Sequence, residues 1–154
     1  MDVTDFIANG EVLYRRVPNA PGLYSTLPNG DLRLSSTAFN DRGEKPSVDR
    51  AILRLSPEET KHEVKDGVVT LGASEIRSIV NIADTEAIDG EPLNYAIDVL
   101  YRPILAGNPE GDAENLAHAQ IEAAPAFKAS SRFKKLKEAL AVMASKHGWL
   151  VSPS

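Results

Sequence analysis

Three polar side chains alternate with small apolar ones between Asn115 and Phe127. If this segment is an extended strand, its successive side chains point to opposite faces, so His118, Gln120 and Glu122 line one surface. The opposite face then carries Ala117, Ala119 and Ile121. An imidazole titrates near neutral pH, and a carboxylate on the same surface can orient it or exchange a proton with it. The row predicts a catalytic site, although such alternation is also typical of the solvent-facing side of a sheet.

A second candidate site lies at the start of a predicted C-terminal helix. Arg132, Lys134 and Lys135 fall in its first turn. The helix dipole is already positive there, so each cation should cost roughly a few tenths of a kcal/mol. Backbone N–H groups at a helix start and basic side chains together form a natural cradle for phosphate. The pattern predicts anion binding, and the alternative is a lysine-rich face in contact with solvent.

Several polar residues also follow a familiar order along the chain. An arginine on the first predicted strand (Arg15 or Arg16) precedes the run Ser35-Ser36-Thr37, which precedes Gln120-Ile121-Glu122. This succession resembles the Arg, Ser-Thr-Ser, Gln/Glu-x-Glu motifs of ADP-ribosyltransferases and similar NAD-cleaving toxins. The serine run departs from that pattern by reading Ser-Ser-Thr.

The resemblance to ADP-ribosyltransferases implies a set of residue roles and a cofactor. It implies that Arg16 holds the phosphates of NAD, that Ser36 braces the site and that Glu122 contacts the nicotinamide ribose. It also implies that Gln120 places the acceptor. An NAD-consuming activity is therefore the alternative to a simple binding function.

Other signatures of enzymes and metal sites are missing from the sequence. There is no cysteine, and the three histidines stand at no paired spacing, so zinc is not expected. Asn115 and the acidic loop before it offer oxygen ligands for a divalent cation, but no metal site is predicted. The chain has no Walker loop, no G-x-G-x-x-G and no G-x-S-x-G elbow. The cofactor is left unknown.

Composition and charge narrow the class of protein. With 154 residues, of which 42% are hydrophobic and 25% charged, the chain fits one soluble folded domain over 1–154. We expect a cytoplasmic, microbial protein, because the N-terminus lacks a secretion-signal pattern, no apolar run is long enough to span a bilayer, and cysteine is absent. The net charge of −5 argues against general nucleic-acid binding.

The charges are unevenly distributed along the chain. Between Asp84 and Glu122 there are nine acids and one base, whereas between Lys128 and Lys146 there are six bases and one acid. The two segments either lie near one another in the fold or leave a basic docking face for an anionic partner.

Alternation and β-branched or aromatic residues predict the strands. Besides the strand around His118, these are expected over 12–17, 32–36, 68–71 and 94–101. The short segment 50–55 fits either a strand or the start of a helix. Polar, glycine-rich or proline-rich composition predicts loops over 40–46, 84–92 and 103–115.

Helices are predicted from capping residues and apolar spacing. Ser56 and Glu59 form a capping-box pattern for a short helix, Ser74 can cap another, and residues 4–9 fit one helical turn. Ser130 or Ser131 should cap a longer helix that ends at His147-Gly148. Its apolar stripe consists of Phe133, Leu136, Leu140 and Met143.

These elements predict an α+β fold: a mostly antiparallel sheet with short helices and a longer amphipathic C-terminal helix packed on it. The function expected is a binding module for a protein partner or a small anionic ligand.

Overall fold

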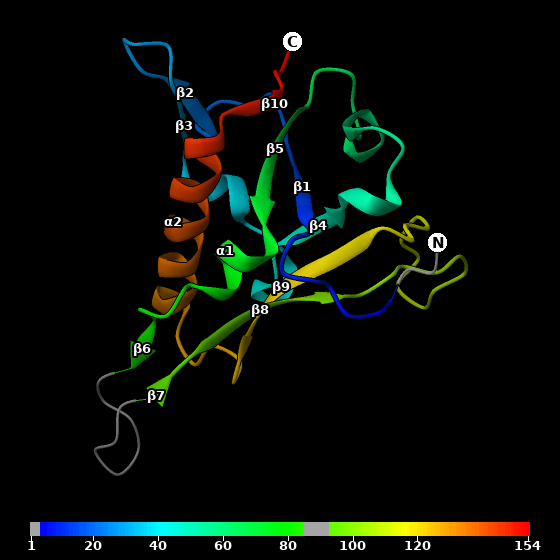
Figure 1. Ribbon diagram of the computed structural model, residues 1–154, viewed down its shortest axis with the longest axis vertical. Coiled ribbons are helices and arrows are strands. Elements are labelled where there is room, and N and C mark those ends of the chain that lie inside the picture. The colour runs from blue at the N-terminus through cyan, green and yellow to red at the C-terminus, as the bar shows by residue number, and fades with distance from the viewer. Residues whose placement is uncertain (1–3, 85–92) are drawn as a thin grey trace.

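The computed structural model describes residues 4–84 and 93–154, which are built around one antiparallel sheet (Figure 1). The sheet has six strands in the order β10-β5-β1-β4-β9-β8, and each neighbouring pair is antiparallel. In chain order the strands are β1 (Val12–Val17), β4 (Ser47–Arg50), β5 (Gly67–Gly72), β8 (Ala96–Tyr101), β9 (His118–Ala124) and β10 (Trp149–Val151). The predicted α+β class is confirmed.

The long helix α2 (Ser130–His147) packs against the core face of this sheet. Phe133, Leu136 and Leu140 of the predicted stripe are buried, and Met143 is partly buried against the same core. Each buried apolar side chain stabilises the fold by roughly 1.5–3 kcal/mol. The helix ends at Gly148, whose φ of 74° favours glycine. Because α2 occupies one face, polar groups of the central strands are directed to the other.

Side chains of the central strands alternate between the core face and a polar face. On β1, Leu13 and Val17 are fully buried in the core, and on β9 Ala119 and Ile121 belong to the same core. The intervening positions lie on the opposite face. They are Tyr14 and Arg16 on β1, Ser47 and Asp49 on β4, and His118 and Gln120 on β9.

Two small hairpins extend from the ends of the molecule beside α2 (Figure 1). One pairs β2 (Tyr24–Thr26) with β3 (Leu32–Leu34), and the other pairs β6 (Ala83–Asp84) with β7 (Leu93–Asn94). Most of the predicted 84–92 loop lies outside the described residues. The other elements of the described residues are the short helix α1 (Ala73–Arg77) and the 3-10 turns η1 (Ser36–Phe39), η2 (Arg42–Glu44), η3 (Ala51–Leu53) and η4 (Pro57–Thr60).

The prediction missed two strands of the main sheet. β4 begins directly after the segment expected to be a polar loop, and the ambiguous 50–55 segment contains the turn η3. β10 follows Gly148 and pairs with β5, and no strand was predicted after the C-terminal helix. These strands have four and three residues, which is too short for alternation to stand out against neighbouring loops.

The helix starts also differ from the prediction. Ala129, whose methyl group cannot accept a hydrogen bond, occupies the N-cap of α2 in place of a serine. The Glu59 carboxylate accepts from the N–H of Leu55, outside the predicted capping box. Gly72 replaces Ser74 as the N-cap of α1, with its N–H donating to Glu75.

Residues 4–9 form bends and a turn instead of a helical turn, and the buried Arg50 holds this segment in place. Arg50 donates to the carbonyl of Thr4 and forms a 2.8 Å ion pair with Glu11. A buried guanidinium therefore fixes the N-terminal segment where one helical turn was expected. Within the described part of the chain, no helix has the length and hydrophobicity needed to cross a bilayer.

Candidate functional site

A broad hollow of about 1300 Å³ opens on the polar face of the sheet, and we call it the sheet hollow. Its floor is formed by β1, β4 and β9, and its walls by residues 40–45, 54–62 and 102–115. The lining contains both histidine and serine side chains, and its six basic residues are matched by six acidic ones. The basic residues are Arg15, Arg16, Arg42, Lys45, Arg54 and Arg102, and the acidic residues are Asp41, Asp49, Glu59, Glu110, Asp112 and Glu114.

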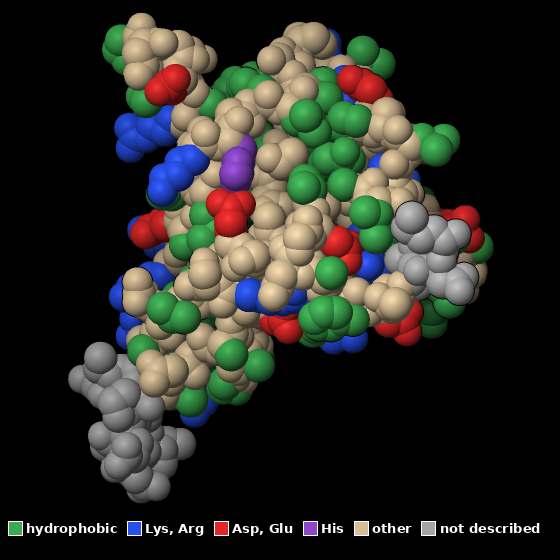
Figure 2. Space-filling model, viewed as in Figure 1, with side chains coloured by type: hydrophobic (Ala, Val, Ile, Leu, Met, Phe, Trp, Pro, Cys, Tyr) green, Lys and Arg blue, Asp and Glu red, His purple; other side chains and the backbone are tan. Residues whose placement is uncertain are grey.

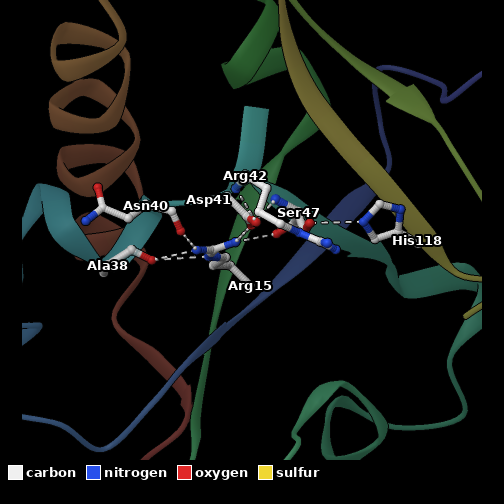
Figure 3. A network of polar contacts seen from close by, with 7 residues as sticks. All are labelled: Arg15, Ala38, Asn40, Asp41, Arg42, Ser47 and His118. Carbon is white, nitrogen blue, oxygen red and sulfur yellow. Dashed lines mark hydrogen bonds and ion pairs between the residues drawn. The ribbon is translucent and has the colours of Figure 1, made fainter. Parts of the chain in front are cut away.

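His118 and Ser47 form a hydrogen-bonded pair on the floor of the sheet hollow. The His118 side chain is 7% exposed, and its Nδ1 lies 2.7 Å from the carbonyl oxygen of Arg102. A carbonyl can only accept, so in the neutral imidazole Nδ1 carries the proton and Nε2 is the acceptor. Nε2 lies 3.0 Å from the Ser47 Oγ, so the serine hydroxyl donates to it (Figure 3).

The backbone of Ser47 is held from both sides (Figure 3). Its N–H donates to the Oδ2 of Asp41 at 2.9 Å, and its carbonyl accepts from the Nη1 of Arg15 at 2.8 Å. Ser47 also begins β4, whose neighbour β9 carries His118. The position of the serine hydroxyl is therefore determined by the sheet and by an ion pair on the same segment.

The Arg15–Asp41 pair is a structural support and has little capacity left for a ligand. The Arg15 side chain is 11% exposed, pairs with Asp41 at 2.9 Å, and also donates to the carbonyls of Ala38 and Asn40. Burial opposes ionisation of Asp41, but the Ser47 N–H and the Arg15 guanidinium outweigh burial and lower the pKa of its carboxyl group. Asp41 is therefore kept as a carboxylate.

A second network fixes the wall beside His118. The buried Asp49 accepts from Arg54 at 2.9 Å, from the Thr60 hydroxyl at 2.8 Å and from the Asn115 amide at 2.9 Å. Arg54 also donates to the Asn115 side-chain oxygen at 2.9 Å. These groups use one another as hydrogen-bond partners. They therefore join β4 to η4 and to the 102–115 segment and make a rigid wall.

Three groups on the floor retain hydrogen-bonding capacity. Arg16 is 32% exposed and forms an ion pair with the Asp66 carboxylate at 3.6 Å, a distance at which most of its N–H donors are left for another partner. Asp66 is already bound by the N–H groups of His62 and Glu63. Among the described residues, the Tyr14 hydroxyl and the Gln120 amide form no hydrogen bond, and both line the sheet hollow. An incoming group can therefore be met by three donors.

The three polar residues predicted to share one face of a strand are on β9. His118, Gln120 and Glu122 lie on one face of the strand, and the first two line the sheet hollow. Glu122 is bound by Arg102, with its Oε2 at 2.9 Å from Nε, and no hydrogen bond within the described chain joins it to His118. The backbone carbonyl of Arg102, and not the carboxylate, orients the imidazole.

The other predicted site residues lie apart from one another. Arg16 lines the sheet hollow, whereas Ser36 begins η1 and lines a separate groove between the β2–β3 hairpin and α2. The three cations at the start of α2 line neither of these two depressions; they are Arg132, Lys134 and Lys135. Figure 2 shows basic side chains gathered along the α2 edge of the molecule.

Sequence reasoning missed Ser47 and Asp41. Both fall in or beside the segment expected to be a polar loop, whereas Ser47 begins β4 and Asp41 caps η2. The available signal was the alternation Ser47, Val48, Asp49 directly after Pro46, with only the valine apolar.

Comparison with protein-family models, with curated proteins and with solved structures finds no match for this chain. In the part of the chain that the structure describes, no group of three or more histidine, aspartate or glutamate side chains is placed to hold a metal ion.

Proposed function

We propose that the protein binds a small anionic ligand in the sheet hollow. The observation that carries this proposal is a set of groups on the floor with donors left over: the guanidinium of Arg16, beyond its 3.6 Å ion pair with Asp66, the amide of Gln120 and the hydroxyl of Tyr14. Arginine presents donors only, and it pairs well with carboxylate or phosphate oxygens. A ligand rich in acceptors would satisfy all three groups at once.

The shape of the hollow supports a small ligand over a flat protein partner. Small-molecule sites are concave and hold a few convergent polar groups on rigid elements. The floor is formed by three paired strands, and the Asp41 and Asp49 networks fix two of its walls.

The balance of charge around the hollow predicts how binding should respond to salt. The lining of the hollow contains six basic and six acidic residues, so the hollow as a whole has little net charge. Long-range attraction is then weak, and affinity depends on short contacts with Arg16 and Gln120. Binding should fall only modestly as ionic strength rises, in contrast to binding on a basic surface.

Calorimetric titration with inorganic pyrophosphate and with NAD tests the proposal. The Arg16→Gln variant should bind roughly ten- to a hundredfold more weakly, because a charge-assisted hydrogen bond contributes about 1.5–3 kcal/mol. Asp66 loses its ion pair with Arg16 in this variant but keeps its two backbone donors, so the protein should stay folded.

Arg33→Gln is the matched control, because Arg33 is exposed on β3 and lines the other groove. It makes the same change in charge and should leave affinity unchanged. If both variants bind as tightly as the parent protein, the ligand does not occupy the sheet hollow and the proposal is wrong.

An NAD-derived ligand is a specific second candidate. Arg16 and Glu122 both belong to the polar face of the sheet. Glu122 does not line the hollow itself, but it accepts a hydrogen bond from Arg102, which does. A pyrophosphate held by Arg16 fits the anion-binding proposal whether or not NAD is cleaved. The separate location of Ser36 means that any such site would lack the serine brace implied by the resemblance.

The cytoplasmic location stays a prediction.

A further inference from the structure

We propose that Ser47 is a nucleophile that attacks the carbonyl carbon of an ester, with His118 as its general base. The inference rests on the proposed function, because Arg16 would hold the anionic part of the same substrate. It adds a reaction to a binding site: hydrolysis of a small anionic ester through an acyl-serine intermediate.

The geometry of the pair matches what an activated serine requires. The Ser47 Oγ and the His118 Nε2 are 3.0 Å apart, which lies within reach for proton transfer. The Arg102 carbonyl fixes the opposite nitrogen at 2.7 Å and so selects the tautomer that can accept the serine proton. This carbonyl performs the orienting task that a carboxylate performs in a serine–histidine–aspartate triad.

Gln120 is placed to stabilise the negative charge that forms on the carbonyl oxygen. It is the direct cross-strand partner of Ser47, so their Cβ atoms are about 4.5–5.5 Å apart. Its amide is one of the groups on the floor that makes no hydrogen bond to the described residues. A glutamine side chain that starts this close to Ser47 is long enough to extend its amide N–H to an oxyanion on the carbon bonded to the Ser47 Oγ.

The reaction balances without an added oxidant or reductant. The Ser47 Oγ bonds to the carbonyl carbon as its proton moves to the His118 Nε2. The tetrahedral intermediate then expels the alcohol, which takes that proton, and an acyl-serine ester remains. Water then attacks the carbonyl carbon of this ester, and His118 accepts a proton from the water. The acid is released and His118 returns the proton to the Ser47 Oγ.

Covalent labelling with a fluorophosphonate tests the nucleophile. The probe should attach to Ser47, with loss of fluoride, and intact mass and peptide mapping should find one label per chain. His118→Asn should slow labelling by at least about a hundredfold, the lower end of what a general base contributes. Ser25→Ala, which removes an exposed hydroxyl on β2, should be labelled like the parent protein. An unlabelled parent, or labelling that His118→Asn does not slow, overturns the proposal.

A Ser47→Cys variant gives a second measurement, because the natural chain has no cysteine. Its single thiol should react with iodoacetamide faster than the thiol of Ser25→Cys, although position 25 is more exposed. Adding His118→Asn should remove that advantage. Equal or slower reaction at position 47 contradicts activation by His118.

Anion binding and labelling can fail separately, which keeps the two proposals distinct. Ser47→Ala should still bind pyrophosphate while losing all labelling. If the parent protein binds pyrophosphate but is not labelled by the fluorophosphonate, only the proposal that Ser47 is a nucleophile is wrong. Labelling of Ser47 in a protein that does not bind pyrophosphate refutes the anion site, and with it the assignment of an anionic substrate.

Discussion

Replacing Asp41 should destabilise the fold strongly, although this residue is only partly buried. Its carboxylate accepts from the N–H groups of Ser47 and Arg42 and pairs with the buried guanidinium of Arg15, all three at 2.9 Å. Removing one partner of a buried ion pair costs about 3–5 kcal/mol. Arg15 keeps backbone carbonyl acceptors, so we expect about 2–4 kcal/mol for Asp41→Ala.

Urea unfolding at pH 7 measures this loss directly. Asp5→Ala is the control, because Asp5 is exposed and forms no ion pair with the described residues; it should change stability by less than about 0.5 kcal/mol. A double-mutant cycle with Arg15→Met should give a coupling energy above about 1 kcal/mol, because the two side chains act as a pair. If Asp41→Ala unfolds at the same urea concentration as the Asp5→Ala control, the ion pair does not support β4 and this reasoning is wrong.

Three further predictions concern acid stability, packing and the NAD alternative. The pKa values of Glu11, Asp41 and Asp66 are lowered in the fold: burial opposes ionisation, but hydrogen bonds and arginines outweigh it. Their contribution to the free energy of unfolding is complete above the ordinary carboxyl pKa and should be lost as pH falls below about 4. A free energy of unfolding that stays constant as pH falls through this range would contradict the prediction. Gly67→Ala should cost about 1–3 kcal/mol in chemical denaturation, because its Cβ would lie 2.5 Å from the Trp149 ring; Gly10→Ala, where no described atom lies within 4 Å, should not. If NAD is the substrate, Glu122→Gln should abolish nicotinamide release with little change in melting temperature. If the variant and the parent protein release nicotinamide equally fast, the NAD-consuming alternative is wrong.

The parts of the fold that could be predicted are those with long periodic patterns. The apolar stripe of α2 extends over three turns, and the alternation around His118 extends over the six residues 117–122, five of which lie in β9. In both cases many positions repeat one signal, so the face of each element could be assigned. β1 and β5 were predicted instead from their β-branched and aromatic residues, over 12–17 and 68–71, and the structure has them at Val12–Val17 and Gly67–Gly72.

The Ser47–His118 pair could not be predicted, because it depends on contacts between distant segments. The two residues are separated by 71 positions, and the strand that carries Ser47 has four residues. Register between β4 and β9 decides which polar group faces the imidazole, and no local pattern encodes that register. Arg16 and Ser36 illustrate the converse. Their order along the chain suggested one site, yet they line separate depressions.

Chemical-shift mapping with inorganic pyrophosphate tests the location of the anion site most directly. We predict that the largest shifts fall on the backbone amides of 14–16, 47 and 118–120 and on the Gln120 side-chain amide. Shifts confined to 130–135, at the start of α2, would place the anion on that helix and contradict the assignment to the sheet hollow.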